Sequence, residues 1–260
     1  MWDPAQYLHF SDERSRPFYE LAGRIGATAP AFVADLGCGP GQLTASLAER
    51  WPGATVLGLD SSADMIAAAR AAGYGGPEVS QRLRFEVGDV ADWRPAEPAD
   101  VIISNAVLQW VPQHRELLPR WAGYLAAGGW LAFQLPGNND QPVHDLIREL
   151  AASSRWRDQL SGISLNRQAG DPAEYLDLLG REGLTVDAWE TTYLHVLQGE
   201  DPVTDWYRGT GLRPVLAALD EAGGAEFVRE YSQRVRLLYP ARPYGTVLPF
   251  RRVFVVAHRA

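Results

Sequence analysis

Three glycines at alternate positions, Gly37, Gly39 and Gly41, constrain this chain more than any other feature. A short apolar run leads to them through Asp35, and an amphipathic segment follows them. Because glycine has no Cβ atom, it lets a backbone turn sharply from a strand into a helix while lying close to a ligand. The pattern therefore predicts a strand, a tight turn and a helix that together form a ligand-binding edge.

Two further acids follow later strand-like runs. Asp60 ends the apolar run at residues 55–59, where an acid typically binds the two hydroxyls of a ribose. Asp89 follows the run at residues 83–87, where a carboxylate can accept from the amino group of an adenine. The sequence therefore predicts a site for a nucleoside-type cofactor.

The spacing of the glycines narrows the choice of cofactor. A dinucleotide fingerprint reads G-x-G-x-x-G, whereas this turn reads G-x-G-x-G. S-adenosylmethionine has no pyrophosphate and carries an ammonium and a carboxylate at its methionine end, so it fits this shorter turn better. We expect five more residues near the strand ends to complete its site: Asp35, Ser61, Met65, Val90 and Asn105.

Composition excludes several classes of enzyme. The chain has 260 residues and a net charge of −8, and all 24 of its basic residues are arginine. Without lysine it can form neither a Schiff base nor a phosphate-loop NTPase site, nor the Tyr/Lys pair of some dehydrogenases. An acidic chain also repels nucleic acid and anionic lipid at long range, so neither is expected as a partner. The oligomeric state stays open.

The cysteine and histidine pattern predicts neither a disulfide nor a metal site. Cys38 is the single cysteine and is interpreted as a small residue in a tight turn. The five histidines lack the spacing of zinc ligands. No apolar segment has the length of a signal peptide or a membrane span, so we expect a cytoplasmic protein.

Strand-like and helix-like segments alternate with short links as far as residue 135, which predicts a doubly wound, mostly parallel, seven-stranded Rossmann-like α/β sheet. After Pro136 two long helical stretches, 142–160 and 202–239, interrupt this rhythm. We expect helical inserts that cap the active site. The predicted parts are an N-terminal helical arm (1–28), a cofactor-binding core (29–135), cap inserts (136–184 and 196–250) and the last core strands (185–195 and 251–260).

Arginines near the end of the chain suggest an anionic substrate. Arg251 and Arg252 adjoin an apolar strand, and side chains alternate along a strand, so one of the two is expected to point into a binding cavity. In an acidic protein, such an arginine indicates a carboxylate. His195 ends the expected strand at 185–195 and is a candidate contact to the substrate.

Several motifs resemble known proteins. The glycine turn, Asp60 and Asp89 resemble the class I methyltransferases over about residues 30–135. Segments across nearly the whole chain resemble the trans-aconitate 2-methyltransferases: the opening WDP and RSRP, DSS at 60–62, SNA with QW at 104–110, WETTYLH at 189–195 and TGLRP at 210–214. The chain departs from that family at Gln42, where asparagine is usual, and in a longer loop at residues 71–81.

The resemblance implies transfer of a methyl group from S-adenosylmethionine to one carboxylate of trans-aconitate, which yields a monomethyl ester. A carboxylate is already ionised at neutral pH, so the in-line displacement needs neither a general base nor a metal. Arginines would hold the other carboxylates, with Arg252 and Arg213 expected first and Arg251 and Arg242 in reserve. The expected cavity is completed by Tyr7, Gln109, Trp110, Tyr193, His195 and Tyr244.

Other functions remain open at this point. The acceptor could be another small polycarboxylate, a phenol or an amine, and a phenol would need a base, for which His195 is the candidate. A protein that binds S-adenosylmethionine without turnover is a second alternative. A nicotinamide oxidoreductase is disfavoured by the glycine spacing and by the absence of lysine.

Overall fold

The computed structural model describes residues 11–165 and 169–260 and divides into two compact units. Unit 1 comprises residues 1–135, 170–190 and 253–260, and unit 2 comprises residues 136–169 and 191–252. The boundaries cross two long strands, β6 (Thr185–Leu197) and β7 (Thr246–His258), which contribute residues to both units.

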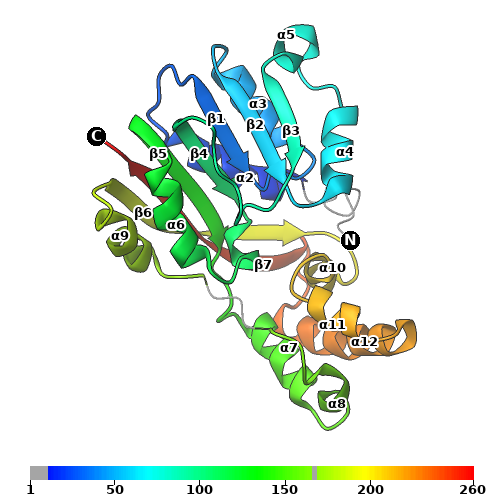
Figure 1. The fold of residues 1–260 in the computed structure, drawn as a ribbon. Coiled ribbons are helices and arrows are strands. Elements are labelled where there is room, and N and C mark those ends of the chain that lie inside the picture. The colour runs from blue at the N-terminus through cyan, green and yellow to red at the C-terminus, as the bar shows by residue number, and fades with distance from the viewer. Residues whose placement is uncertain (1–10, 166–168) are drawn as a thin grey trace. The chain divides into compact units, whose positions relative to one another are not determined.

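A seven-stranded sheet with the order β3-β2-β1-β4-β5-β7-β6 organises the fold (Figure 1). Every strand pair from β3 to β5 is parallel. The strand order changes direction between β1 and β4, and doubly wound sheets bind ligands at the carboxyl ends of the strands beside such a switch. The predicted fold class is confirmed. The first five strands are β1 (Phe32–Leu36), β2 (Thr55–Asp60), β3 (Leu83–Val87), β4 (Ala99–Asn105) and β5 (Leu125–Pro136).

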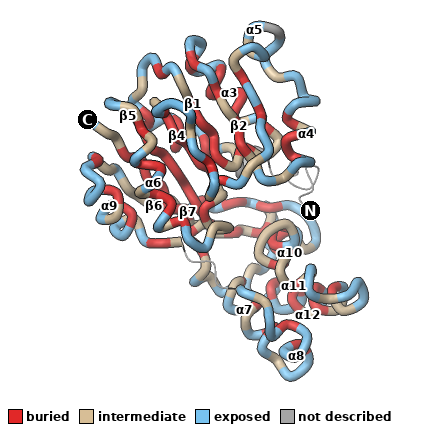
Figure 2. The backbone as a smooth tube through the Cα atoms, in the orientation of Figure 1, coloured by how far each residue is buried: buried red, intermediate tan, exposed pale blue. Residues whose placement is uncertain are grey.

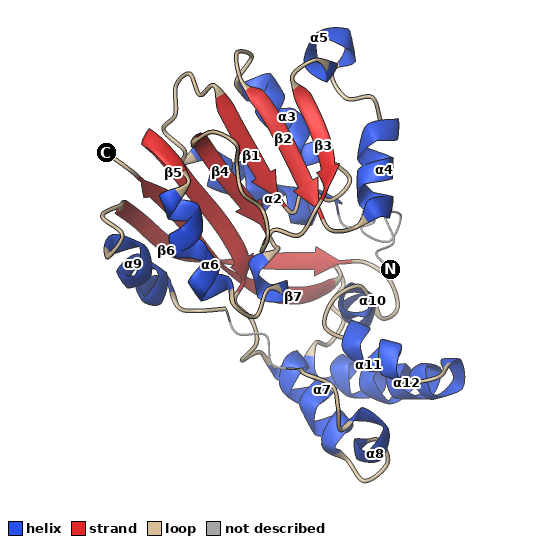
Figure 3. Ribbon diagram, viewed as in Figure 1, coloured by secondary structure: helices blue, strands red, loops and turns tan. Residues whose placement is uncertain are grey.

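Helices of unit 1 cover both faces of the parallel strands (Figure 3). In that view α2 (Ser11–Gly23) and α3 (Gln42–Arg50) lie behind the strands, and α6 (His114–Gly123) lies in front of them. Four apolar residues of the predicted N-terminal arm are buried in this unit: Phe18, Leu21, Ala22 and Ile25. The remaining helices of unit 1 are α4 (Ala63–Ala71), α5 (Gly76–Ser80), the 3₁₀ turn η1 (Leu108–Trp110) and α9 (Pro172–Gly180).

Unit 2 is built from helices, the second half of β6 and the first half of β7. The long helix α12 (Glu221–Leu238) packs against α7 (Pro142–Ala152), and Phe227 and Tyr231 are fully buried there (Figure 2). Asp220 caps α12 by accepting a bond from Gly223 N at 2.7 Å. The other helices are α8 (Arg157–Leu160), α10 (Pro202–Arg208) and α11 (Arg213–Ala218).

Several predicted boundaries were wrong, each for a local reason. The stretch predicted at 142–160 breaks where Ser153 turns extended, and the stretch at 202–239 breaks into α10, α11 and α12. The second of these breaks occurs at Leu219, which is also extended and precedes the cap of α12. Within the glycine-rich loop, α5 forms one short helix after Gly75, whose φ is +73°. Strand β7 begins at Thr246, earlier than the core strand predicted at 251–260.

The compact units divide the chain differently from the domain boundaries expected from the sequence. Helix α9, which was expected in the cap, belongs to unit 1, where Arg115 of α6 pairs with Glu174. No helix among residues 11–165 and 169–260 combines the length and the apolar character that a bilayer crossing requires.

Candidate cofactor and substrate sites

The glycine turn follows β1 directly and is fixed by the end of β2. The N–H groups of Gly37 and Cys38 both donate to the carbonyl of Leu59, at 2.7 and 3.0 Å. Gly37, Gly39 and Gly41 have φ angles of +89°, +56° and +83°, a region that residues with a Cβ atom rarely adopt. The sequence pattern is therefore explained by the backbone, which requires glycine at all three positions.

Asp60 links this turn to the start of α4. One carboxylate oxygen accepts from Gly39 N at 2.9 Å, and the other accepts from Ser62 N at 2.8 Å. Each oxygen keeps a free lone pair, and the side chain is only half-buried. Asp60 thus presents an oriented carboxylate at the carboxyl edge of the sheet, as a ribose-binding acid must.

Asp35 lies beneath the turn and is 2% exposed. The Thr44 hydroxyl donates to its carboxylate at 2.6 Å, which ties the end of β1 to α3. Burial, together with the negative charge of Asp60, raises the pKa of Asp35 from 3.8 to about 7, although the Thr44 bond opposes this shift. In this structure Asp35, predicted as a cofactor-binding residue, joins the end of β1 to α3 and is closed to solvent.

The three glycines differ in how much space lies beside them. A Cβ atom on Gly37 would lie 2.0 Å from Val107 Cγ2, and one on Gly41 would lie 2.6 Å from the Phe85 ring. A Cβ atom on Gly39 would meet nothing within 4 Å. Gly37 and Gly41 are therefore packed against the protein, whereas Gly39 borders open space that a cofactor could occupy.

The other predicted cofactor residues lie at the ends of β2, β3 and β4. Ser61 is exposed, whereas Met65 is buried and its N–H donates to the Ser62 cap. The Asp89 carboxylate is exposed and accepts from Ala91 N at 2.8 Å, while Val90 is buried. This arrangement leaves polar groups at the rim and apolar groups beneath them, which suits an adenosine.

The segment after β4 is backbone-strained. Ala106 is the one residue other than glycine with a positive φ, +57°, in the described part of the chain. Gln109 donates to the Ala106 carbonyl at 2.6 Å, and Trp110 is half-buried on η1. Asn105 is buried and accepts from the amide of Gln134. The predicted site residues of this segment therefore lie in one tightly bonded turn.

Unit 2 contains a buried aromatic and cationic cluster. Arg252 is 3% exposed, and its guanidinium carbon lies 4.9 Å from the centre of the Phe250 ring. His195 is 7% exposed and stacks on Tyr193 and on Trp206, with ring centres 5.9 and 5.0 Å away. The structure thus brings together three predicted substrate residues, namely Arg252, His195 and Tyr193.

The other predicted substrate residues lie elsewhere. Arg251 donates to the Gly137 carbonyl at 2.8 Å, so it holds the chain after β5. Arg242 and Tyr244 form an exposed pair at a turn, 2.8 Å apart. Burial lowers the pKa of Arg213, which is half-buried at the start of α11. Tyr7 lies outside the described residues. Of the two neighbouring arginines on β7, Arg252 is the buried one.

Sequence reasoning missed four polar residues that bond either to a predicted residue or to each other. Thr44 and Gln134 each bond a predicted residue, and Asn138 and Tyr207 form a buried pair in unit 2 with Asn138 Nδ2 donating to the hydroxyl at 3.1 Å. The place of Asn138 directly after an apolar run and Pro136-Gly137 was a usable signal. Tyr207 has no such signal, because nothing in a helical pattern distinguishes it from core.

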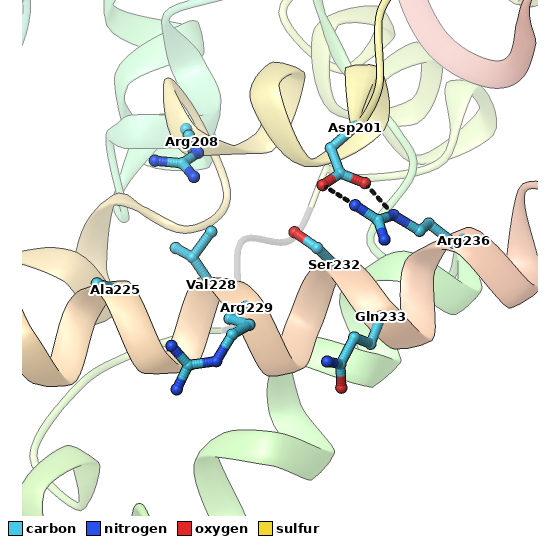
Figure 4. Close-up of a pocket in the computed structure, with 8 residues that line it drawn as sticks. All are labelled: Asp201, Arg208, Ala225, Val228, Arg229, Ser232, Gln233 and Arg236. Carbon is cyan, nitrogen blue, oxygen red and sulfur yellow. Dashed lines mark hydrogen bonds and ion pairs between the residues drawn. The ribbon is translucent and has the colours of Figure 1, made fainter.

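A hollow of about 250 Å³ on unit 2 holds more arginines but does not resemble a substrate site (Figure 4). It lies between α10 and α12, and Arg236 there forms two bonds with Asp201, at 2.6 and 2.7 Å. Arg229 pairs with Glu226, and Arg208 with Asp205. Because each cation already faces an acid, we place no substrate in this hollow.

Cys38 is not a reactive thiol, and the described residues contain no metal-binding cluster. Burial raises the pKa of the Cys38 thiol well above its usual range, with Asp35 and Asp60 adding to the shift, so the thiol stays protonated. Across the described residues, histidine, cysteine and acidic side chains form no group of three that could hold a metal ion.

Known proteins match both the sequence and the fold. A family model described as a methyltransferase domain matches residues 33–129. A trans-aconitate 2-methyltransferase of Streptomyces avermitilis is 54% identical over 99% of this chain and 97% of its own length. Proteins with the same name from Rhodococcus jostii and Mycobacterium tuberculosis are 50% and 46% identical, over 99% of this chain in both cases and over 99% and 96% of their own lengths.

Solved structures agree at the level of fold. The YcgJ protein of Bacillus subtilis superposes with a TM-score of 0.61 at 13% identity, over 94% of this chain and 98% of its own. A Haemonchus contortus phosphoethanolamine N-methyltransferase, solved with S-adenosylhomocysteine, gives 0.58 at 14% identity over 94% of this chain and 52% of its own.

The sheet order, the glycine turn and the matched domain together define a methyltransferase of the Rossmann-like class, so the predicted enzyme class is confirmed. Within that class the full-length relatives decide the family. The chain belongs to the trans-aconitate 2-methyltransferase family.

The glycine turn yields a paired mutational prediction. In Gly39→Ala we expect a modest loss of stability, about 1–2 kcal/mol from the positive φ, together with a clear loss of cofactor affinity. In Gly37→Ala the collision with Val107 should prevent normal folding. Calorimetric titration with S-adenosylhomocysteine and thermal melting separate the two effects. If Gly39→Ala binds as tightly as the parent protein, the open space beside Gly39 is not the cofactor site.

Asp35 yields a prediction for the pH dependence of stability. Between about pH 4 and pH 7 the folded protein keeps a proton on Asp35 that the unfolded chain releases, so the free energy of unfolding falls as pH rises through this window. With a shift of about three pKa units, the full loss is of order 4 kcal/mol above pH 7.

Denaturant unfolding at several pH values should show this fall in the parent protein and not in Asp35→Asn. Thr44→Val removes the bond that lowers the pKa, so it should extend the window to higher pH. Parallel pH profiles for the parent protein and Asp35→Asn would contradict a raised pKa.

Proposed function

We propose that this chain transfers a methyl group from S-adenosylmethionine to one carboxylate of trans-aconitate, with a monomethyl ester as product. The observation that carries the proposal is the extent of the match to relatives of that name. It includes unit 2, which lies outside the methyltransferase-domain match. A shared cofactor core alone would not specify an acceptor.

The donor binds at the glycine turn of unit 1. Gly39 gives close access to the backbone, the Asp60 carboxylate accepts from the ribose hydroxyls, and Asp89 faces the adenine. Bound there, S-adenosylmethionine supplies a methyl group on a positively charged sulfur. The negative charge of Asp60 suits a ligand that carries a sulfonium and an ammonium group.

In unit 2, Arg252 holds a carboxylate of the acid. A guanidinium offers two parallel N–H donors that match a carboxylate, and such pairs are strongest where water is excluded. Arg252 is 3% exposed and lies over the Phe250 ring, so its direction is fixed. His195 stacks on Tyr193 and on Trp206, which fixes the plane of its ring.

The reaction needs little chemistry from the protein. A carboxylate with a pKa near 4 is already the nucleophile at neutral pH, so no residue has to remove a proton. The side chains act by orientation, which can supply roughly 7–11 kcal/mol of rate enhancement. We propose that the enzyme works in the cytoplasm, where its single thiol stays reduced, and that its partner is a small anion rather than nucleic acid.

The decisive test is methyl transfer from labelled S-adenosylmethionine to a panel of acids, with mass spectrometry of the products. We expect a monomethyl ester of trans-aconitate and weaker reaction with cis-aconitate, citrate and isopropylmalate-like acids. Methylation of a phenol or amine in place of every acid would overturn the acceptor. Tight binding of S-adenosylhomocysteine without any turnover would instead indicate a binding protein.

Variants of Arg252 test the role of unit 2. Arg252→Lys keeps the charge but loses the paired donors, and we expect its KM for the acid to rise about 10- to 100-fold, with a larger rise in Arg252→Ala. The affinity for S-adenosylhomocysteine should stay unchanged. Arg229→Ala, which removes an exposed arginine of α12, is the matched control. Equal KM values in all four proteins would remove Arg252 from the substrate site.

A further inference from the structure

Directly after β5, the chain of unit 2 places a buried amide beside a buried hydroxyl. Asn138 is 3% exposed and Tyr207 of α10 is 2% exposed. Asn138 Nδ2 donates to the Tyr207 hydroxyl at 3.1 Å. The reaction described above uses neither residue.

This pair has unused hydrogen-bonding capacity. Among the described residues Asn138 Oδ1 finds no hydrogen-bond partner, although it is fully buried. The Tyr207 hydroxyl accepts in its bond with Asn138, so that bond does not use the hydroxyl proton. An unpaired buried polar atom typically lowers stability by about 1–3 kcal/mol. A pair with a purely structural role is not expected to retain such a cost.

Rotation of the Asn138 amide by half a turn changes which of its atoms bonds to Tyr207. The amide oxygen and nitrogen exchange places, and the Tyr207 hydroxyl can then donate to Oδ1. The amide nitrogen, with two N–H donors, then occupies the buried position that now holds the unpaired oxygen. In that orientation the pair satisfies the tyrosine and offers donors to an anion.

The segment that carries Asn138 is held firmly. Gly137 N donates to the Arg251 carbonyl at 3.0 Å, and the Arg251 guanidinium donates back to the Gly137 carbonyl at 2.8 Å. These two bonds join the residue before Asn138 to the residue before Arg252. In unit 2 the amide and the guanidinium therefore project from two backbone segments that are bonded to each other.

We propose that Asn138 determines specificity for the acid by donating from Nδ2 to a carboxylate that does not react, while Tyr207 holds the amide in this orientation. The inference rests on the proposed function, because it concerns the same acid. A tricarboxylate has two carboxylates to spare. Arg252 binds one of them, and Asn138 binds the other.

A buried tyrosine elsewhere in unit 2 provides a comparison. Tyr231 of α12 is also fully buried, and its hydroxyl lies 3.5 Å from the Val143 carbonyl, an ordinary backbone acceptor. Among the described residues, no amide with an unpaired atom forms a hydrogen bond with it. Tyr231→Phe is therefore a matched control for the loss of a buried hydroxyl.

The experiment measures KM for trans-aconitate and for three unsaturated dicarboxylates. Each dicarboxylate lacks a different one of the three carboxylates of trans-aconitate. Where turnover is slow, the inhibition constant is measured in place of KM. We expect Asn138→Ala to raise KM for the tricarboxylate about 10- to 100-fold, as for a lost hydrogen bond to a charged group. For at least one dicarboxylate, Asn138→Ala should change KM less than about twofold, because that dicarboxylate lacks the group that Asn138 binds.

Two further variants sharpen the test. Asn138→Asp keeps the size of the side chain but repels an anion, so it should raise KM more than Asn138→Ala does. Tyr207→Phe should raise KM by a smaller factor, and Tyr231→Phe should leave it unchanged. The affinity for S-adenosylhomocysteine should stay near that of the parent protein in every variant, and Tyr231→Phe should also keep the kcat of the parent protein.

Three results would overturn the inference. One is an equal rise in KM for the tricarboxylate and all dicarboxylates in Asn138→Ala, which would indicate a structural role for Asn138. Another is an unchanged KM in Asn138→Asp. The third is an equal effect of Tyr207→Phe and Tyr231→Phe. Failure of the proposed function would be distinct, because the parent protein would then methylate none of the acids.

Discussion

The structure of unit 1 depends on the link between the end of β2 and the glycine turn. The Leu59 carbonyl accepts from two N–H groups of the turn, and the Asp60 carboxylate accepts from Gly39 N and Ser62 N. Two parallel strands and two helices are joined in this way within a few residues. The turn is therefore rigid before any ligand binds, and preorganisation of this kind lowers the entropic cost of binding.

The same link explains why an acid is buried beneath the turn. Asp35 cannot be solvated there, and Asp60 lies close enough to raise its pKa further. A carboxyl group that is costly to ionise destabilises the empty protein at neutral pH, and a cationic ligand nearby offsets part of that cost. The acids of the turn thus suit a ligand that carries a positively charged sulfur. This electrostatic argument agrees with the glycine spacing, although the two are independent.

The sequence predicted unit 1 well, because local patterns determine it. Strand periodicity, the glycine spacing and the positions of Asp60 and Asp89 each depend on residues close together in the chain. The resemblance to a known family added the acceptor, which no local pattern could supply. Boundaries failed where a single residue leaves helical geometry, as at Ser153 and Leu219, since nothing in their neighbourhood marks the break.

The site residues of unit 2 were harder to predict, for a physical reason. Alternation along β7 predicted that one of Arg251 and Arg252 would point into a cavity, but it could not say which, and the structure adds only that Arg252 is the buried one. Tyr207 and Trp206 look like core aromatics, and both are buried as core residues are. What distinguishes Tyr207 is its bond to Asn138, a residue far away in the sequence. Buried polar pairs of this kind reduce stability unless something uses their free groups. The Asn138–Tyr207 pair in the interior of unit 2 is therefore better explained by the binding of a polar ligand than by the needs of folding.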